Sequence, residues 1–208
     1  GPNHAEEVAR KVPSATVIAS RDGELSRTLQ SSFSSTYLRV YTNNDVVGVE
    51  VGGAYKNVIA LAAGMLDGLG LGDNTKATLI TRGLAEMARF GSALGANPIT
   101  FSGLSGIGDL IVTCISRHSR NRGYGERLGA GDSPADVLAE SRMVVEGVYA
   151  TRAVIAMAGE MKVEIPIARG VNAVLQEKAS PGEMLEQLMT RSLKDETEES
   201  LYRDFLLK

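Results

Sequence analysis

The feature that most constrains the fold is the stretch from Val49 to Gly64, VEVGGAYKNVIALAAG, in which one lysine and one asparagine interrupt a run otherwise suited to burial. If the stretch is a helix, residues three and four positions apart lie on one face, and on one face almost all side chains are absent or small. Its residues are Gly52, Gly53, Lys56, Ala60, Ala63 and Gly64. Glycine inside a helix costs about 1 kcal/mol relative to alanine. These small residues therefore indicate that either a packed helix or a bound small molecule approaches the backbone of this face closely.

Lys56 is the one long polar side chain on that face, and two interpretations of it stay open. Neighbours this small and apolar would remove water from the amine, and desolvation disfavours the charged form of a lysine unless an acid lies near it. A lysine in that state can act as a general base. Alternatively, the stem of Lys56 lies over apolar surface while the amine reaches water.

The composition is that of an ordinary soluble protein with one large domain or two small ones. The 208 residues carry a net charge of −3 and 43% of them are hydrophobic, so no basic field indicates nucleic acid. No apolar run reaches the roughly 18 residues that a membrane span requires. We therefore expect neither nucleic acid nor a membrane among the partners.

Cysteine and histidine are scarce. Cys114 is the single cysteine, which excludes an internal disulfide and fits a reducing compartment such as the cytoplasm. His4 and His118 are far apart in sequence, and neither belongs to a cluster with metal-ligand spacing. We therefore expect no metal site.

Secondary-structure patterns divide the chain near Asn43. Before it, a short charged helix precedes a β-rich run at 15–20, a helix at about 24–33 and a second strand at 37–42, which together form one βαβ unit. A single such unit cannot cover both faces of its sheet. We therefore expect the rest of a parallel sheet upstream of this chain.

After the second strand every pattern is helical, which predicts a mainly α fold. Asn44 or Asp45 can cap a long helix that runs to about residue 69, and Asp73 or Asn74 starts a second one that ends on Gly95. Shorter helices are expected at about 100–115, 122–130, 134–141, 146–160, 166–178 and 181–190. The charged tail, KDETEESLYRDFLLK, is either a last helix or a loose end.

The stretch SGLSGIGDLIVTC contains an isolated acid. Asp109 follows a glycine and enters the apolar run LIV, with no other acid between Glu86 and Glu126. Such a carboxylate either caps a helix start or pairs with a buried cation, and pairing with Lys56 would satisfy both charges. Thr113 lies one helical turn further along the same face. The glycines here and in GLGLG do not match the G-x-G-x-x-G fingerprint, and we expect them to form turns.

A basic segment, SRHSRNRG, follows at an expected helix start. In it Arg117, Arg120 and Arg122 surround Ser119 and Asn121. The planar guanidinium group suits phosphate oxygens, and amides at a helix N-terminus add partial positive charge. The segment is either an anion site or an exposed basic loop that faces water.

Together, five segments of the chain resemble the NAD(P)-dependent glycerol-3-phosphate dehydrogenases. They are GPNHAEEV, RVYTNNDVVGVEVGGAYKNVIALAAGMLDGLGLGDNTKATLITRGLAEM, GLSGIGDLIVTC, SRNR and MVVEGV, in that family's order and spacing. The resemblance implies reversible hydride transfer between NAD(H) or NADP(H) and dihydroxyacetone phosphate, giving sn-glycerol 3-phosphate for phospholipid synthesis. It also implies two domains. Residues 1–43 would be the C-terminal remnant of a Rossmann-like dinucleotide-binding domain, and residues 44–208 an all-helical substrate domain of the 6-phosphogluconate dehydrogenase C-terminal type.

The resemblance also implies roles for single residues. Lys56 matches the lysine that transfers a proton to the C2 oxygen as hydride arrives, Asp109 the acid near it and Thr113 the threonine that follows. Substrate contacts are implied for Gly1, Asn3, Lys56, Asn57, Asp109, Ser119, Arg120 and Asn121, the last three of them on the phosphate. Cofactor contacts are implied for Arg120, Val144 and Glu146.

The family's glycine-rich first βα turn and a further substrate lysine have no counterpart in this chain. We therefore expect a fragment that folds its helical domain, holds the cofactor incompletely and does not catalyse alone. Three alternatives stay open: a related hydroxyacid or 6-phosphogluconate type of dehydrogenase, a non-catalytic anion-binding module, and a dimerisation module. A homodimer is among the partners considered.

Overall fold

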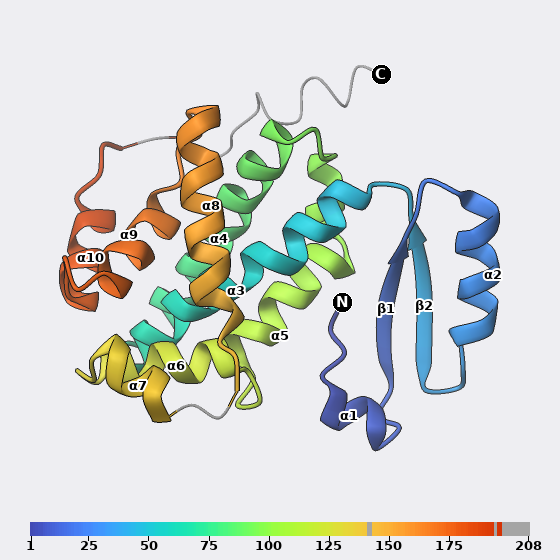
Figure 1. Ribbon diagram of the computed structural model, residues 1–208, viewed down its shortest axis with the longest axis horizontal. Coiled ribbons are helices and arrows are strands. Elements are labelled where there is room, and N and C mark those ends of the chain that lie inside the picture. The colour runs from blue at the N-terminus through green and yellow to red at the C-terminus, as the bar shows by residue number, and fades with distance from the viewer. Residues whose placement is uncertain (141–142, 194, 197–208) are drawn as a thin grey trace.

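The computed structural model describes residues 1–140, 143–193, 195 and 196, in which a helical body has a small parallel sheet at its edge (Figure 1). The edge unit consists of α1 (Ala5–Ala9), β1 (Ser14–Ala19), α2 (Gly23–Phe33) and β2 (Leu38–Asn43). The body consists of α3 (Val46–Gly68), α4 (Asp73–Ala93), a 3₁₀ turn η1 (Pro98–Ser102), a π-helical turn η2 (Leu104–Gly108), α5 (Asp109–Ile115), α6 (Arg120–Gly129), α7 (Pro134–Glu140), α8 (Glu146–Met161), α9 (Pro166–Leu175) and α10 (Pro181–Met189). The predicted mainly α fold class is confirmed.

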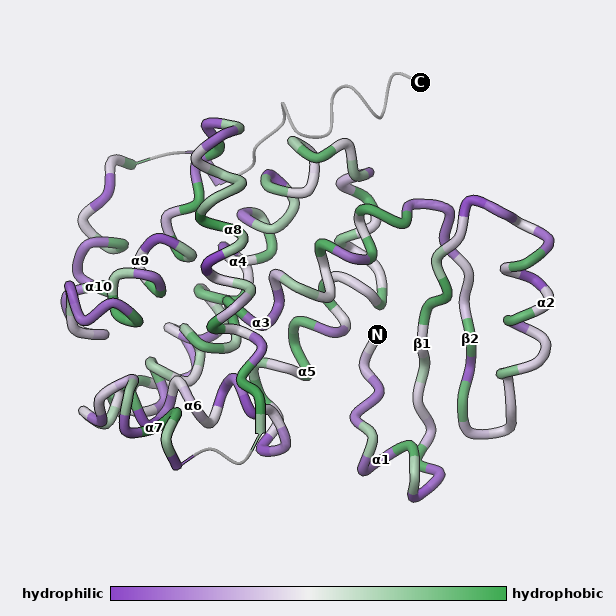
Figure 2. The backbone as a smooth tube through the Cα atoms, viewed as in Figure 1, coloured by the Kyte–Doolittle hydropathy of each residue, from purple (hydrophilic) through white to green (hydrophobic). Residues whose placement is uncertain are grey.

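Helix α3 runs through the middle of the helical body, where α4, α5, α6, α8 and α9 all contact it. Every residue from Val58 to Leu66 is buried, and Figure 2 shows apolar residues along most of the helix. A helix that is apolar on nearly every side must be covered on every side. The core therefore forms around α3, and the remaining helices are placed by their contacts with it.

The glycines of α3 allow close approach of other backbone segments. A Cβ atom at Gly64 would lie 1.9 Å from the carbonyl oxygen of Arg122 in α6. A Cβ atom at Gly52 would lie 2.3 Å from the carbonyl oxygen of Ser105 in η2. Packed backbone, rather than a bound small molecule, therefore explains these two glycines.

The βαβ unit forms as predicted. Strands β1 and β2 pair in parallel, with Ser14 opposite Leu38 and Ala19 opposite Asn43. Helix α2 connects them and packs against both, and Asp22 caps it by accepting hydrogen bonds from two backbone amides of its first turn. The chain then crosses from β2 to the start of α3. The loop before α1 lies beside the helical body (Figure 1).

The prediction of one helix at 100–115 is wrong. The segment forms η1, η2 and α5 instead, and a Cβ atom at Gly106 would lie only 2.0 Å from the carbonyl oxygen of Phe101. The backbone therefore folds back on itself in a way that periodicity cannot indicate. Asp109 begins α5, and no side-chain cap bond occurs at this helix start, so the interpretation of Asp109 as a cap is also wrong.

Other helix limits are close to those expected. Asp45, rather than Asn44, caps α3 by accepting a hydrogen bond from Gly48 N at 2.9 Å. Gly95 has a φ of +86° just beyond the end of α4. Helix α9 ends at residue 175, before the predicted 178, because Glu177 has a left-handed φ of 54°. The predicted tail element falls largely on residues 194 and 197–208, outside the described residues.

Helix α3 is long and apolar enough to cross a membrane by length and composition alone. The expectation that no segment reaches that size is therefore wrong for this helix. In the fold, however, 61% of its most apolar window is buried inside the protein. Burial among neighbouring helices is the arrangement of a core helix.

Candidate active site

Lys56 and Asp109 form an ion pair between α3 and α5. Lys56 Nζ lies 2.7 Å from Asp109 Oδ2. The lysine side chain is 21% exposed and the aspartate side chain 8% exposed. The pairing considered from the sequence is therefore present, and the lysine amine is held by a carboxylate while part of the side chain still reaches water.

Thr113 and the start of the chain fix the carboxylate from two sides. Thr113 Oγ1 donates to the backbone oxygen of Asp109 at 2.6 Å and lies 3.4 Å from its Oδ1 atom. The backbone nitrogen of Gly1 lies 3.0 Å from Asp109 Oδ2. The loop that precedes α1 thus reaches the ion pair, and this loop contains Gly1 and Asn3, for which the family resemblance implied substrate contacts.

Side-chain amides join α3 to α6 and α8 beside the ion pair. Asn121 Nδ2 donates to Asn57 Oδ1 at 2.9 Å, and Gly147 N donates to Asn121 Oδ1 at 2.8 Å. Asn57 Nδ2 in turn donates to Glu146 Oε2 at 3.3 Å. Because both ends of each amide are used, the orientation of Asn57 and Asn121 is fixed.

The first turn of α6 contains the predicted anion-binding residues. Ser119 is the N-cap and accepts a hydrogen bond from Arg122 N at 3.3 Å. Arg120 is exposed and donates from Nη1 to the carbonyl oxygen of Val144 at 3.2 Å. This bond joins two of the predicted cofactor residues, Arg120 and Val144, and the third, Glu146, begins α8 two positions after Val144.

These side chains surround one cavity of about 150 Å³. The predicted residues on its walls are Gly1, Asn3, Lys56, Asn57, Asp109, Thr113, Ser119, Arg120, Asn121 and Glu146. Val144 is the one predicted residue that does not line it. The Val144 side chain is exposed, and its carbonyl oxygen accepts the bond from Arg120.

Three further residues line the cavity without having been predicted: His4, Val112 and His118. The separation of the two histidines in sequence argued against a metal site, but the fold brings their ring centroids to 6.1 Å. The sequence signal for a site role was that His4 follows Asn3 and His118 precedes Ser119, both of them predicted site residues. Val112 was indicated by the helical spacing that also places Asp109 and Thr113 on one face of α5.

Two arginines of the basic segment do not join the cavity. Arg122 Nε lies 2.7 Å from Asp67 Oδ2, and Arg117 is exposed and not among the lining residues. The anion-site hypothesis therefore narrows to Arg120 and the first turn of α6. Within the described residues, no group of three His, Cys, Asp or Glu side chains could hold a metal ion.

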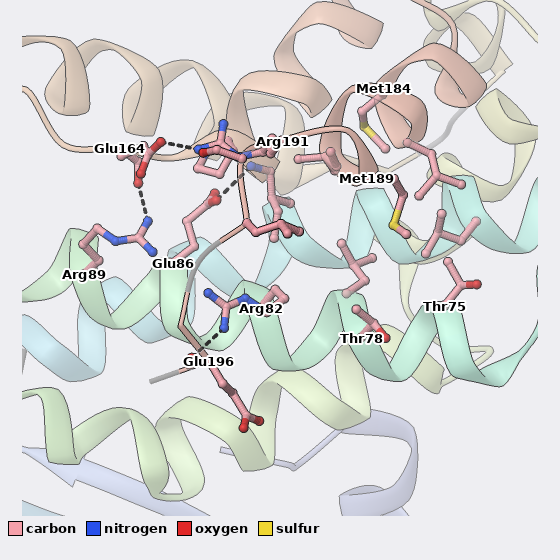
Figure 3. Close-up of a pocket in the computed structure, with 18 of the residues that line it drawn as sticks. Thr75, Thr78, Arg82, Glu86, Arg89, Glu164, Met184, Met189, Arg191 and Glu196 are labelled. Atoms are coloured by element: carbon pink, nitrogen blue, oxygen red, sulfur yellow. Dashed lines mark hydrogen bonds and ion pairs between the residues drawn. The ribbon is translucent and has the colours of Figure 1, made fainter. Parts of the chain in front are cut away.

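A more voluminous cavity, of about 600 Å³, lies between α4, α9 and α10 (Figure 3). Its walls are mostly apolar and include Met184 and Met189. Its charged groups contact one another, since Glu164 pairs with Arg191 and accepts a hydrogen bond from Arg89 through its backbone oxygen. No predicted site residue lines this cavity, so we place the candidate active site at the smaller one.

Glu86 lies at the wall of this second cavity and is 1% exposed. Its carboxyl group accepts hydrogen bonds from Tyr55 Oη at 2.8 Å, Ile167 N at 2.8 Å and Ala168 N at 2.9 Å. Burial raises the pKa of the Glu86 carboxyl above its ordinary value, against the lowering effect of the hydrogen bonds that it accepts. Glu86 thus connects α3, α4 and α9.

Comparison with known proteins matches residues 45–186 to a family described as the NAD-dependent glycerol-3-phosphate dehydrogenase C-terminus. The chain is 54% identical to an NAD(P)-dependent glycerol-3-phosphate dehydrogenase of Pelotomaculum thermopropionicum, over 96% of this chain and 57% of that protein. For a Staphylococcus aureus protein of the same name the identity is 53%, over 94% of this chain and 59% of that protein. A solved structure of glycerol-3-phosphate dehydrogenase from Coxiella burnetii is similar with a TM-score of 0.89 and 40% identity, over 92% of this chain and 59% of that one. The chain therefore spans less than three fifths of the length of these relatives.

Proposed function

The chain belongs to the C-terminal family of the NAD-dependent glycerol-3-phosphate dehydrogenases, and we propose that it supplies the substrate site and the proton-transferring lysine of such an enzyme. The proposed reaction is the reversible NAD(P)H-dependent reduction of dihydroxyacetone phosphate to sn-glycerol 3-phosphate, a precursor of glycerophospholipids. The observation that carries the proposal is the Lys56–Asp109 ion pair on the wall of a small polar cavity, beside the N-terminus of α6.

Reduction of the ketone adds a hydride to C2 and a proton to the C2 oxygen. Reduced NAD(P)H, when bound, supplies the hydride. The Lys56 ammonium group donates the proton, and the amine that remains regains a proton from water through its exposed part. Asp109, at 2.7 Å, stabilises the ammonium form before transfer and orients the amine. In the reverse direction the neutral amine accepts the proton from the alcohol.

The first turn of α6 positions the phosphate group. Backbone amides at a helix N-terminus lack intrahelical partners and attract anions, and the exposed Arg120 adds a guanidinium group. The Asn121 side chain is already bonded to Asn57 and to Gly147 N. Its contribution to the phosphate therefore comes from its backbone amide, while its side chain holds the three helices together.

The chain contains part of a cofactor site. Arg120 and Glu146 line the cavity, and Arg120 donates a hydrogen bond to the carbonyl oxygen of Val144. The sequence contains no G-x-G-x-x-G turn to hold a pyrophosphate. These residues fit contacts from the helical side with a dinucleotide held mainly elsewhere. We therefore propose that the 208-residue chain shows no turnover by itself with NAD(P)H and dihydroxyacetone phosphate, and detectable turnover would contradict this.

The test joins the chain to the dinucleotide-binding region of a relative and measures oxidation of NADH and of NADPH that depends on dihydroxyacetone phosphate. We expect the parent to turn over and Lys56→Ala to lose at least about 10²-fold in kcat, because general acid catalysis contributes about 10² to 10⁴. Arg117→Ala, outside the cavity, is the control and should keep the parent rate. A parent that ignores this substrate but reduces a ketoacid to a hydroxyacid, or oxidises 6-phosphogluconate with NAD(P)+, would reassign the function.

We further propose a cytoplasmic location and a homodimer. Cys114 is a buried free thiol whose pKa is raised by burial to about 12, and an unpaired cysteine fits a reducing compartment. The edge unit offers apolar surface for a second copy, including the exposed Phe33 and Tyr41. Sedimentation equilibrium tests the dimer, and a monomer at every concentration would contradict it.

A further inference from the structure

His4 and His118 are the two histidines of the chain, and both line the cavity that contains Lys56. His4 lies in the loop before α1, and His118 lies in the loop that ends at the Ser119 cap of α6. Their ring centroids are 6.1 Å apart and their planes are inclined by 59°. The fold therefore places two imidazole rings next to the first turn of α6.

One of these rings has a polar atom without a partner. Among the described residues, His4 Nε2 is a buried side-chain nitrogen that makes no hydrogen bond. Buried polar atoms are nearly always hydrogen-bonded, because leaving one unpaired costs its full desolvation. Because His4 itself lines the cavity, a turn of the ring that brings Nε2 to the cavity would let a bound ligand supply the missing partner.

The charges of the cavity point to the same conclusion. Among its side chains, the cations Lys56 and Arg120 face the carboxylates Asp109 and Glu146, so their formal charges cancel. A phosphate monoester carries a charge of about −1.5 to −2 at neutral pH. With Lys56 bonded to Asp109, the imidazole rings are the remaining side chains on these walls that can add positive charge when protonated.

We propose that the imidazole rings of His4 and His118 bind the phosphate group of the substrate through ring N–H donors, with His4 Nε2 as one of them. The proposal rests on the proposed function, because it takes the ligand to be a phosphate monoester of a three-carbon alcohol or ketone. It extends the anion site from one helix start to two separate segments of the chain.

NMR spectroscopy of the 208-residue chain tests the contact directly, since two histidines give two sets of imidazole signals that single substitutions assign. The chain is titrated with sn-glycerol 3-phosphate, with inorganic phosphate and with glycerol. We expect both phosphate-bearing probes to shift both sets of signals and glycerol to shift neither. His4→Ala and His118→Ala should each weaken sn-glycerol 3-phosphate binding at least about tenfold, as expected for a charge-assisted hydrogen bond. The glutamine variants, which keep an N–H donor, should recover part of the loss.

Kinetics of the enzyme joined to its dinucleotide-binding region separate this role from a structural one. The histidine variants should raise KM for dihydroxyacetone phosphate at least about tenfold with kcat nearly unchanged, whereas Lys56→Ala lowers kcat. Imidazole signals that ignore sn-glycerol 3-phosphate while Arg120→Ala abolishes its binding would overturn the proposal. Signals that respond to NADH alone would also overturn it and assign the pair to the cofactor. A parent without activity whose signals still shift with phosphate would refute the proposed function and leave the anion site standing.

Discussion

At the scale of single residues, the candidate site depends on one lysine whose charge is matched by one carboxylate. Asp109 Oδ2 lies 2.7 Å from Lys56 Nζ, and Thr113 holds Asp109 from within α5. We regard Asp109 as acting through Lys56, because a carboxylate at this distance orients the amine by a charge-assisted hydrogen bond. The same geometry predicts how the effects of substituting Lys56 and Asp109 on kcat combine.

In the joined enzyme, Asp109→Asn should lower kcat by about 10²-fold, because the amine loses the charge that orients it. The double variant with Lys56→Ala should be no slower than Lys56→Ala alone, since residues that act as one unit are not additive. Steady-state kinetics of the parent and three variants provide the measurement. Additive losses in the double variant would show that Asp109 acts on the substrate independently of Lys56.

At the scale of elements, the contact between α3 and α6 positions the first turn of α6, the proposed phosphate-binding end of the site. Four glycines make this contact possible, because a Cβ atom on any of them would lie within 2.3 Å of a carbonyl oxygen of the facing helix: Gly64, Gly68, Gly125 and Gly129. The two backbones therefore pack more closely than side chains would allow. Arg120 and the Ser119 cap lie at the start of the helix placed in this way.

Two glycine-to-alanine substitutions in α6, one inside this contact and one outside it, test the contact by comparison. Gly125→Ala places a Cβ atom 2.0 Å from the carbonyl oxygen of Leu61, so it should destabilise the fold by about 1 to 3 kcal/mol or more. Gly123→Ala meets nothing within 4 Å and should be neutral, or stabilising by up to about 1 kcal/mol from helix propensity. Urea unfolding followed by circular dichroism measures both. Equal effects of the two changes would contradict close packing as the reason for these glycines.

Most elements could be predicted from the sequence, because caps and periodicity are local. Asp45 caps α3, α4 begins at the predicted Asp73 although no side chain caps it, and Gly95 has a left-handed φ just beyond the end of α4. The π-helical turn η2 could not be predicted, since Gly106 is required by the approach of Phe101 rather than by its own neighbours in sequence. Of the two readings of Asp109, the structure has the ion pair, because the packing of α5 on α3 places the carboxylate at the lysine amine.

The site residues also divide into those that the sequence indicated and those that only the fold brought together. Lys56, Asp109 and the Ser119–Asn121 segment stood out by residue type, and the family resemblance joined them into one site before any contact was known. His4 and His118 did not stand out, because two histidines separated by most of the chain give no pattern. Their proximity at 6.1 Å is a property of the tertiary fold. Their proposed role is therefore one that only the folded chain could suggest.

At the scale of the whole molecule, contacts on several sides of α3 fix its rotation about its own axis. Lys56 bonds to α5 and Asn57 to α6 and α8, while Tyr55 bonds to Glu86 of α4, which also holds two amides of α9. Three consecutive residues of α3 are thus attached to different neighbours. Through Tyr55, the buried Glu86 beside the second cavity (Figure 3) therefore holds the turn of α3 that contains Lys56.

Truncating Glu86 should therefore weaken the whole fold. Glu86→Ala leaves Tyr55 Oη and the amides of Ile167 and Ala168 without their buried acceptor, and each such loss costs about 1 to 3 kcal/mol. We expect the free energy of unfolding to fall by at least about 3 kcal/mol in urea titrations. Glu183→Ala, at the exposed start of α10, should cost clearly less than Glu86→Ala, because it removes only the capping-box contact with Ser180.

The buried position of Glu86 also predicts how stability depends on pH. Burial raises the pKa of its carboxyl above the ordinary 4.5, so the folded chain binds this proton more tightly than the unfolded chain. By linkage, the stability that Glu86 contributes is fully present below pH 4.5 and is lost as the pH rises through the folded pKa. Glu86→Gln cannot titrate, so the unfolding free energy of the parent minus that of the variant should fall as the pH is raised above 4.5.

Urea unfolding of the parent and Glu86→Gln at a series of pH values measures this difference, in which uniform effects of other carboxylates cancel. Two influences compete at Glu86. Burial favours the protonated form, whereas the amides of Ile167 and Ala168, the Tyr55 hydroxyl and the charge of Arg89 favour the carboxylate. If the difference rises with pH, the hydrogen bonds to Glu86 and the charge of Arg89 together outweigh burial, and α9 is held to α4 by a fully ionised carboxylate. A falling difference would mean that the helices around α3 are held together by a neutral acid, most firmly in mildly acidic solution.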